Sequence, residues 1–236
     1  MQIQVSCMTC AVDSDSLGTE HLGWASVTSL AINEWTCPKG HVNRFFLTEP
    51  FYQQLFEEAV WDLVLRDTRE AVTAFYSAWD NFVAHTADML LSEFGAAVEL
   101  PRDAKRAEPR RGAFIALLLA KTHGVPRLPT NKTAETRNLV IHDDKMPSEE
   151  DTFTVGEDIQ ECILRCQSSL PGLHEEYGHG AKSLPRRMRL FEAAQLKPED
   201  LVGVAQTIRM SRIHEKLRAR VAGIRKELPQ PRAKAT

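Results

Sequence analysis

The sequence lacks the motifs of several common enzyme classes. It contains no P-loop, no GxGxxG dinucleotide loop, no GxSxG nucleophile elbow and no HExxH zinc-protease helix. ATP-dependent, dinucleotide-dependent, serine-hydrolase and zinc-protease functions therefore have no support. No run approaches the roughly 18 apolar residues of a membrane-spanning helix, and no basic segment followed by an apolar one stands at the N-terminus. We expect a cytoplasmic protein with no membrane partner.

The overall composition is that of an ordinary globular protein, but its charge is unevenly distributed. Of the 236 residues, 43% are hydrophobic and 26% are charged, which excludes wholesale disorder and a coiled-coil rod. Residues 1–184 hold 16 basic and 27 acidic side chains, whereas residues 185–236 hold 13 and 5. We expect this basic tail to bind RNA phosphates, or else to be a solvated helix face or a contact for an acidic partner protein.

Hydrophobic periodicity divides the chain into three parts. Residues 1–48 contain short runs rich in β-branched and aromatic residues, which is typical of a small β-rich module. Residues 49–170 repeat apolar positions every three or four residues, which predicts helices, with a polar loop over 99–111 and a buried helix over 112–124. Residues 171–236 form a basic helical extension. The expected fold class is mainly α, an antiparallel helical bundle with a small N-terminal module.

Three of the five cysteines lie near the N-terminus with the spacing of a metal site. Cys7 and Cys10 form a CxxC knuckle, and Cys37-Pro-Lys-Gly-His41 forms a second one after 26 intervening residues. Two such knuckles supply the four tetrahedral ligands that zinc prefers, and a bound metal would stabilise a module too small for a good core. We expect a zinc-ribbon-like module with a structural, non-catalytic zinc ion on Cys7, Cys10, Cys37 and His41. His21 or a water molecule is the alternative fourth ligand.

The other two cysteines, Cys162 and Cys166, lie four residues apart on a predicted helix. Metal ligands can have this spacing, but no other cysteine or histidine lies nearby in the sequence. We interpret both as core residues.

The segment Arg-Asn-Leu-Val-Ile-His over 137–142 is the strongest candidate for a catalytic motif. An arginine followed by a histidine five residues later is common by chance, and Arg209 and His214 match the pattern too. Only 137–142 adds an Asn after the Arg and a helix stop with a proline after the His. In this context the segment resembles the HEPN family, whose helical domains carry an Arg-polar-x3–5-His motif, then a turn and another helix.

The resemblance covers about residues 50–170 and implies a HEPN-like bundle. The segment 69–90 is similar to the family's second helix, with Asp80, or less well Glu70, in place of its inward-facing acidic residue. Members with this motif are metal-independent endoribonucleases, so the resemblance implies that the RNA 2′-hydroxyl attacks the adjacent phosphate. That reaction needs a base, an acid and a cation.

The residue types of the motif suit these roles. His142 can transfer protons near neutral pH, and Arg137 is a permanent forked cation suited to phosphate. Positions five apart on a helix differ by about 140° and about 7.5 Å, so Arg137 and His142 do not share a face, whereas Asn138 and His142 do. Asn138 would orient His142 or the phosphate. Asp80 would contact Arg137 or fix the tautomer of His142.

One histidine per chain must serve two proton transfers, and a two-fold homodimer is the economical solution, which the resemblance also implies. The resemblance further implies a toxin or abortive-infection protein of antiviral defence that cleaves RNA, with an antitoxin or sensor protein as a further partner. The rival function is that of a non-catalytic HEPN-like adaptor, which dimerises and binds a partner protein or a nucleotide.

Overall fold

The computed structural model describes residues 2–7, 9–10, 22–26, 33–45, 50–94, 107–171, 213 and 215–227. The chain divides into two compact units, one of residues 1–50 with 172–210 and one of residues 51–171 with 211–236. None of the helices in the described ranges combines the length and the hydropathy that crossing a bilayer requires.

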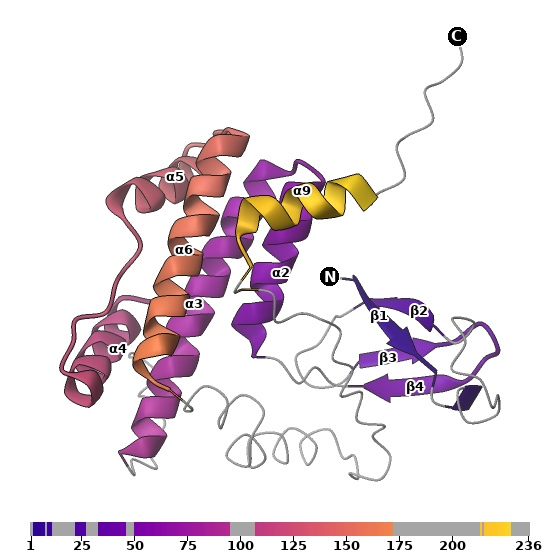
Figure 1. The fold of residues 1–236 in the computed structure, drawn as a ribbon, viewed down its shortest axis with the longest axis horizontal. Coiled ribbons are helices and arrows are strands. Elements are labelled where there is room, and N and C mark those ends of the chain that lie inside the picture. The colour runs from indigo at the N-terminus through magenta and orange to yellow at the C-terminus, as the bar shows by residue number, and fades with distance from the viewer. Residues whose placement is uncertain are drawn as a thin grey trace. The chain divides into compact units, whose positions relative to one another are not determined.

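The N-terminal unit contains two antiparallel strand pairs (Figure 1). The strand β1 (Gln2–Ser6) pairs with β2 (Leu22–Ser26), and β3 (Asn33–Thr36) pairs with β4 (Val42–Phe45). The expected β-rich module is confirmed to this extent. Isolated two-stranded sheets are marginally stable in water, so this unit depends on additional stabilisation.

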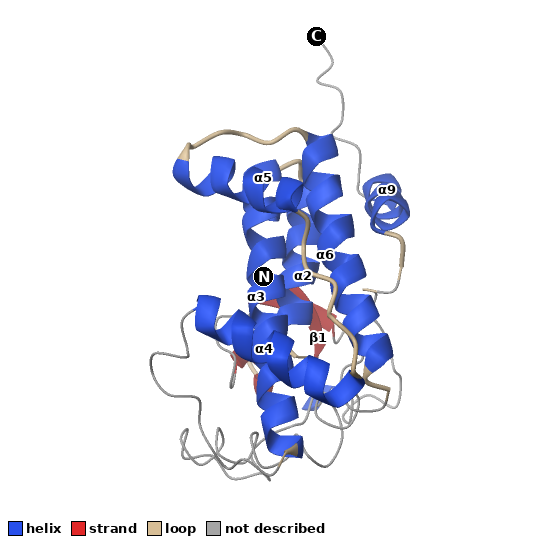
Figure 2. Ribbon diagram, turned by 90° about the vertical axis from the view of Figure 1, so that its left-hand side faces the viewer, coloured by secondary structure: helices blue, strands red, loops and turns tan. Residues whose placement is uncertain are grey.

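The second unit is a bundle built around one long helix. Its described helices are α2 (Phe51–Val64), α3 (Thr68–Glu93), α4 (Ala107–Thr122), α5 (Asn131–His142), α6 (Glu149–Ser169) and α9 (Leu217–Glu227). The helix α3 packs against α2, α4, α5 and α6, and its apolar face forms the core with Phe75, Trp79 and Phe82 fully buried. Both α4 and α5 lie on the same side of α3 (Figure 2). The mainly helical fold class is confirmed, and its HEPN-like character stays a prediction.

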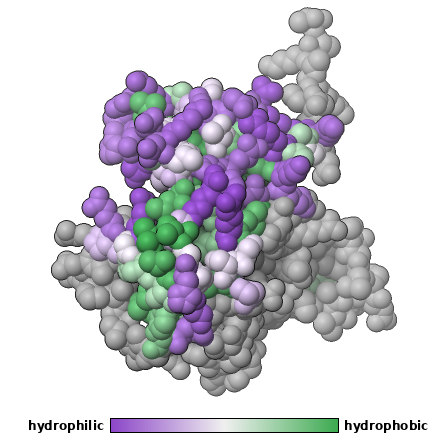
Figure 3. All heavy atoms as spheres, turned by 60° about the vertical axis from the view of Figure 1, so that its left-hand side comes forward, coloured by the Kyte–Doolittle hydropathy of each residue, from purple (hydrophilic) through white to green (hydrophobic). Residues whose placement is uncertain are grey.

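The helix α4 differs from the expectation in two respects. It begins at Ala107, within the stretch expected to be a loop, because Pro109 lies in its first turn, where a missing backbone N–H costs little. The helix is also not buried all round: Phe114 and Leu118 face the core, whereas Leu119 is 43% exposed. Figure 3 shows the resulting hydrophobic patch over α4, beside the hydrophilic surface over α5.

The described part of the basic tail is a component of the bundle. The helix α9 packs against α2 and α6. Its Arg218 side chain contacts Glu150 at 2.7 Å and Glu157 at 2.9 Å, both on α6. Arg220 pairs with Glu57 of α2, and each of these two side chains is only 6% exposed. The basic residues of α9 therefore pair with acidic residues of the same chain.

A third arginine of α9 closes the end of α2. Arg225 donates hydrogen bonds to the backbone carbonyls of Leu63 and Val64 and contacts Glu149 at 2.5 Å. The last carbonyls of a helix have no partner within it, and a cation near them is favoured by the helix dipole. The residues around 185–210, which include Arg209 of the second Arg/His pattern, lie outside the described ranges.

The loop between α4 and α5 is held by one buried carboxylate of α6. Asp158 accepts hydrogen bonds from the Arg127 guanidinium at 2.9 Å, the Thr130 backbone N–H at 2.7 Å and the Thr133 hydroxyl at 2.6 Å. Thr130 is also the N-cap of α5, since its side chain accepts from the Thr133 backbone N–H. Burial raises the pKa of Asp158, but these hydrogen bonds outweigh it and hold the pKa below its usual range. Asp158 thus sets where α5 begins.

We predict that Asp158→Asn lowers the free energy of unfolding by about 2 kcal/mol or more at pH 7, because buried donors lose their acceptor. A carboxyl whose folded pKa is depressed stabilises the protein above its usual pKa, and the effect is lost as the pH falls through the folded pKa. The difference from wild type should therefore narrow toward about pH 3. Urea unfolding at pH 7 and at about pH 3 measures this difference in the free energy of unfolding. The exposed Asp143→Asn is the control, and equal effects of the two variants would contradict the role of Asp158.

The pair between α2 and α9 generates a second prediction. Arg220→Met leaves the Glu57 carboxylate buried without its partner, which should cost about 3 kcal/mol or more. Arg218→Met removes an arginine that is 43% exposed and should cost about 1 kcal/mol or less. Chemical denaturation of the two variants compares them directly. A smaller loss of stability for Arg220→Met than for Arg218→Met would show that α9 is not anchored through Glu57.

Candidate functional site

The two predicted cysteine knuckles meet in the N-terminal unit. Cys7 follows β1 directly, and the backbone N–H of Cys10 donates to the Cys7 sulfur at 3.5 Å. Cys37 follows β3, and His41 precedes β4. Gly40 closes the turn between them with φ of +87°, a conformation that favours glycine. The strands β1, β3 and β4 thus each place one ligand at an end, and Cys10 follows Cys7 by three residues.

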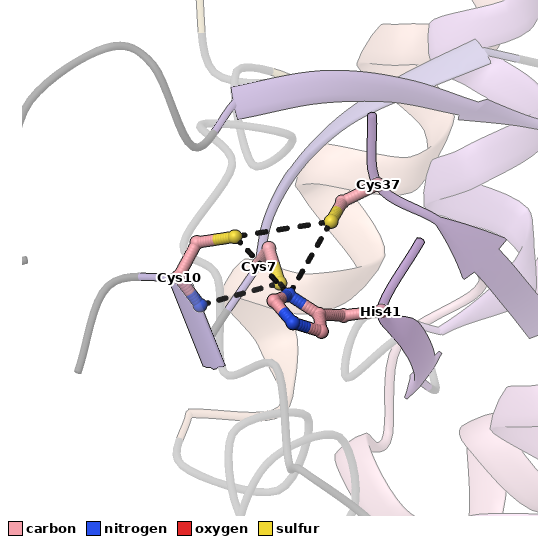
Figure 4. A group of neighbouring side chains, drawn as sticks. All are labelled: Cys7, Cys10, Cys37 and His41. Atoms are coloured by element: carbon pink, nitrogen blue, oxygen red, sulfur yellow. Dashed lines mark hydrogen bonds between the residues drawn. The ribbon is translucent and has the colours of Figure 1, made fainter. Parts of the chain in front are cut away.

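The four side chains point toward one another, and Cys7, Cys10 and Cys37 are fully buried (Figure 4). Their ligand atoms lie within 4.8 Å of one another. The sulfurs of Cys10 and Cys37 are 3.8 Å apart, and the Nδ1 atom of His41 lies 3.3 to 3.7 Å from the three sulfurs. A tetrahedral zinc ion sets sulfurs about 3.8 Å apart and sulfur about 3.5 Å from nitrogen. The group could therefore hold a metal ion.

The pKa values of two cysteines in the cluster shift in opposite directions. Burial raises the pKa of the Cys7 thiol, but hydrogen bonds from the Cys10 backbone and the Asn43 side chain outweigh it and lower the pKa to about 6. Burial, together with the neighbouring Cys7 and Cys37, raises the pKa of Cys10 to about 11. The side chain of Asn43 also donates to the His41 backbone carbonyl at 3.0 Å and so fixes the second knuckle.

His41 joins the three cysteines, while His21, the alternative fourth ligand, lies outside the described residues. Cys162 and Cys166 are buried on α6, and burial raises their pKa values to about 11 and about 12. Both are free thiols. Their interpretation as core residues is confirmed.

A second candidate site lies in the helical bundle, where α3, α4 and α5 meet. Arg137 of α5 lies over the ring of Tyr76 on α3, with its guanidinium carbon 5.7 Å from the ring centroid. Tyr76 and Asp80 are four residues apart on α3 and share a face. Burial raises the pKa of Asp80, against the opposing charges of Arg111, Arg137 and Arg110. The structure therefore places Arg137 beside the face of α3 that carries Tyr76 and Asp80, with no direct ion pair between Arg137 and Asp80.

The other two motif residues, Asn138 and His142, lie in different surroundings. Asn138 accepts a hydrogen bond from Arg137 at 3.1 Å, so in this structure it contacts the arginine of the motif. His142 is exposed in the last turn of α5. Glu70, the less favoured acidic candidate, lies in the first turn of α3, about 15 Å along the helix axis from Asp80.

Sequence reasoning missed two members of this second site. Arg111 of α4 lies 3.8 Å from the Asp80 carboxylate, although its segment was expected to be a loop. Tyr76 supplies the aromatic face under Arg137. The signal for Arg111 was its position three residues before Phe114, which places it at the edge of the buried face of α4.

Comparisons of the chain with protein-family models, with curated proteins and with solved structures found no match.

We predict that the purified protein binds one metal ion per chain through the cysteine and histidine cluster. Cys37→Ser and His41→Ala should each lose the metal, because three ligands hold an ion far less tightly than four. Cys166→Ala is the matched control, since it removes a buried thiol of the bundle and should retain one ion per chain. Elemental analysis measures the ratio, and a metal-free wild-type protein would contradict the assignment.

Proposed function

We propose that this protein is a metal-independent endoribonuclease of the HEPN type, with a structural zinc ion in its N-terminal unit. The observation that supports the nuclease is that Arg137 lies over Tyr76, one turn from Asp80 on the same face of α3, while His142 is exposed on the same helix as Arg137. Arg137, Asp80 and His142 offer a phosphate-binding cation, a carboxylate that positions it, and a group able to transfer a proton.

Each residue has a defined part in the proposed reaction. His142 removes the proton from the RNA 2′-hydroxyl, whose oxygen attacks the adjacent phosphorus and displaces the 5′-oxygen of the next nucleotide. Arg137 stabilises the charge that develops on the phosphoryl oxygens. The leaving 5′-oxygen takes a proton from a second histidine. Asp80 positions Arg137 and does not itself touch the substrate.

The second histidine comes from a second copy of this chain. Within one chain, His142 is the only histidine of the motif, and the helix carries it about 140° around from Arg137. Two apolar side chains near His142 face solvent, since Leu139 and Ile141 are 41% and 42% exposed. Such residues suit burial in an interface. A two-fold dimer through this end of α5 completes the site with both histidines.

Zinc is the proposed metal of the N-terminal unit because three thiolates and one imidazole, arranged at tetrahedral distances, match its preferred donor set. All four ligand positions come from the protein, so no position is left for a substrate or a reactive water. The role assigned to the ion is therefore to stabilise the paired strands, and cleavage should not depend on added divalent cations.

The decisive prediction concerns His142. Wild-type protein should cleave total RNA or tRNA in the presence of EDTA, and His142→Ala should lower the rate by at least about a hundredfold, because it removes a proton-transfer group. Arg137→Ala should do the same. His123→Ala is the matched control, since His123 is also exposed at the end of a helix, α4, and it should retain full activity. Gel electrophoresis of the RNA measures the rates, with zinc content checked in parallel.

Two outcomes would contradict the proposed function. Intact RNA with the wild-type protein would exclude the nuclease, and stable RNA or protein binding without cleavage would favour the adaptor. Equal cleavage by wild type and His142→Ala would exclude this residue. Ile141→Glu tests the dimer: it should give a folded monomer without activity, and an active monomer would show that the site does not need a second copy.

A further inference from the structure

Two arginines lie over one face of α3. Arg111 of α4 is 3.8 Å from the Asp80 carboxylate, and Arg137 of α5 lies over the ring of Tyr76, one turn before Asp80. Since α4 and α5 lie on the same side of α3 (Figure 2), both arginines lie over the face of α3 that carries Tyr76 and Asp80. Arg110 adds a third positive charge that acts on Asp80.

The positive charge of this cluster exceeds what Asp80 neutralises. Among the residues that the structure describes, Asp80 is the only carboxylate within ion-pair distance of Arg111, and none lies within that distance of Arg137. Two permanent cations against one carboxylate leave the cluster with a positive charge. Neighbouring phosphates of one strand would balance this excess.

The guanidiniums also keep unused hydrogen-bond donors. The Arg111 nitrogen is 3.8 Å from the Asp80 oxygen, which is beyond hydrogen-bond distance. Arg137 donates one hydrogen bond to Asn138 and otherwise rests on the Tyr76 ring. Each guanidinium has five N–H donors in a fork that fits phosphate oxygens. The Arg111 and Asp80 side chains are 44% and 42% exposed, so the cluster is open to a ligand.

We propose that Arg111 and Arg137 form one binding site for a phosphate backbone beside Asp80. Arg137 binds one phosphate, and Arg111 binds the neighbouring phosphate. The identity of the ligand as RNA rests on the proposed function. Asp80 is a positioning residue for both arginines. Arg111 therefore determines how the RNA strand crosses α4 on its way to the reacting phosphate on α5.

The test uses the full-length, metal-loaded protein and a fluorescent single-stranded 2′-O-methyl RNA, which lacks the attacking hydroxyl and is not cleaved. Fluorescence anisotropy gives Kd over a range of NaCl concentrations. Arg111→Ala should raise Kd by at least about threefold and reduce the slope of log K against log salt by about 0.7, the value for one lost phosphate contact on a single strand. Arg111→Lys keeps the charge and should keep the slope.

Two further variants separate a specific site from a general loss of charge. Arg165 on α6 is 63% exposed and pairs with Glu161, so Arg165→Ala removes one arginine elsewhere on the bundle and should leave Kd and the slope unchanged. Asp80→Asn removes the negative charge beneath the arginines. It should leave binding of the probe unchanged or tighter, while cleavage of ordinary RNA slows through kcat.

The inference is overturned if wild-type protein does not bind the probe, or if Arg111→Ala and Arg165→Ala change Kd and the slope equally. Circular dichroism of each variant shows that the fold is retained, as expected for exposed side chains. The proposed function fails separately. If the specific effect of Arg111→Ala on binding is found but ordinary RNA stays intact, the phosphate site stands and the nuclease does not.

Discussion

The carboxylate of Asp158 is the constraint on which the placement of the candidate catalytic residues depends. It lies inside the bundle on α6 and accepts three hydrogen bonds from the chain that enters α5. Because these bonds fix the first turn of α5, they also fix the direction in which the helix leaves. Within two turns of the start of α5, Arg137 then lies over the ring of Tyr76 on α3. A buried polar contact in one helix thus determines a surface arrangement on two others.

The two units are stabilised by different means because they differ in what they can bury. The bundle has a core of large apolar side chains around α3, to which the buried pair of Glu57 and Arg220 adds the attachment of α9. The N-terminal unit has only two strand pairs, and its described buried residues include the three cysteines that face one another. A metal held by these cysteines and His41 would supply the stability that a larger core supplies elsewhere.

The predictable parts of the protein are those that depend on local pattern. Strand runs, helical periodicity and the spacing of Cys7, Cys10 and Cys37 identify the elements and the candidate metal ligands, because these signals act over a few residues. Local pattern was insufficient at α4, where Pro109 suggested a loop and the apolar run suggested burial. Burial depends on how many neighbours a helix has. Among the described elements, α4 packs chiefly against α3, and its Leu119 stays exposed.

By itself the sequence determined the type of most elements, the knuckles that could hold a metal, and the presence of an arginine and a histidine on one helix, since each follows from spacing along the chain. Only the tertiary structure decided which residues meet. It placed Arg137 over Tyr76, brought Arg111 to Asp80, and tied the arginines of α9 to acidic residues of α2 and α6. The physical reason is that charges attract across space regardless of their separation in sequence, so pairing is settled by how the helices pack.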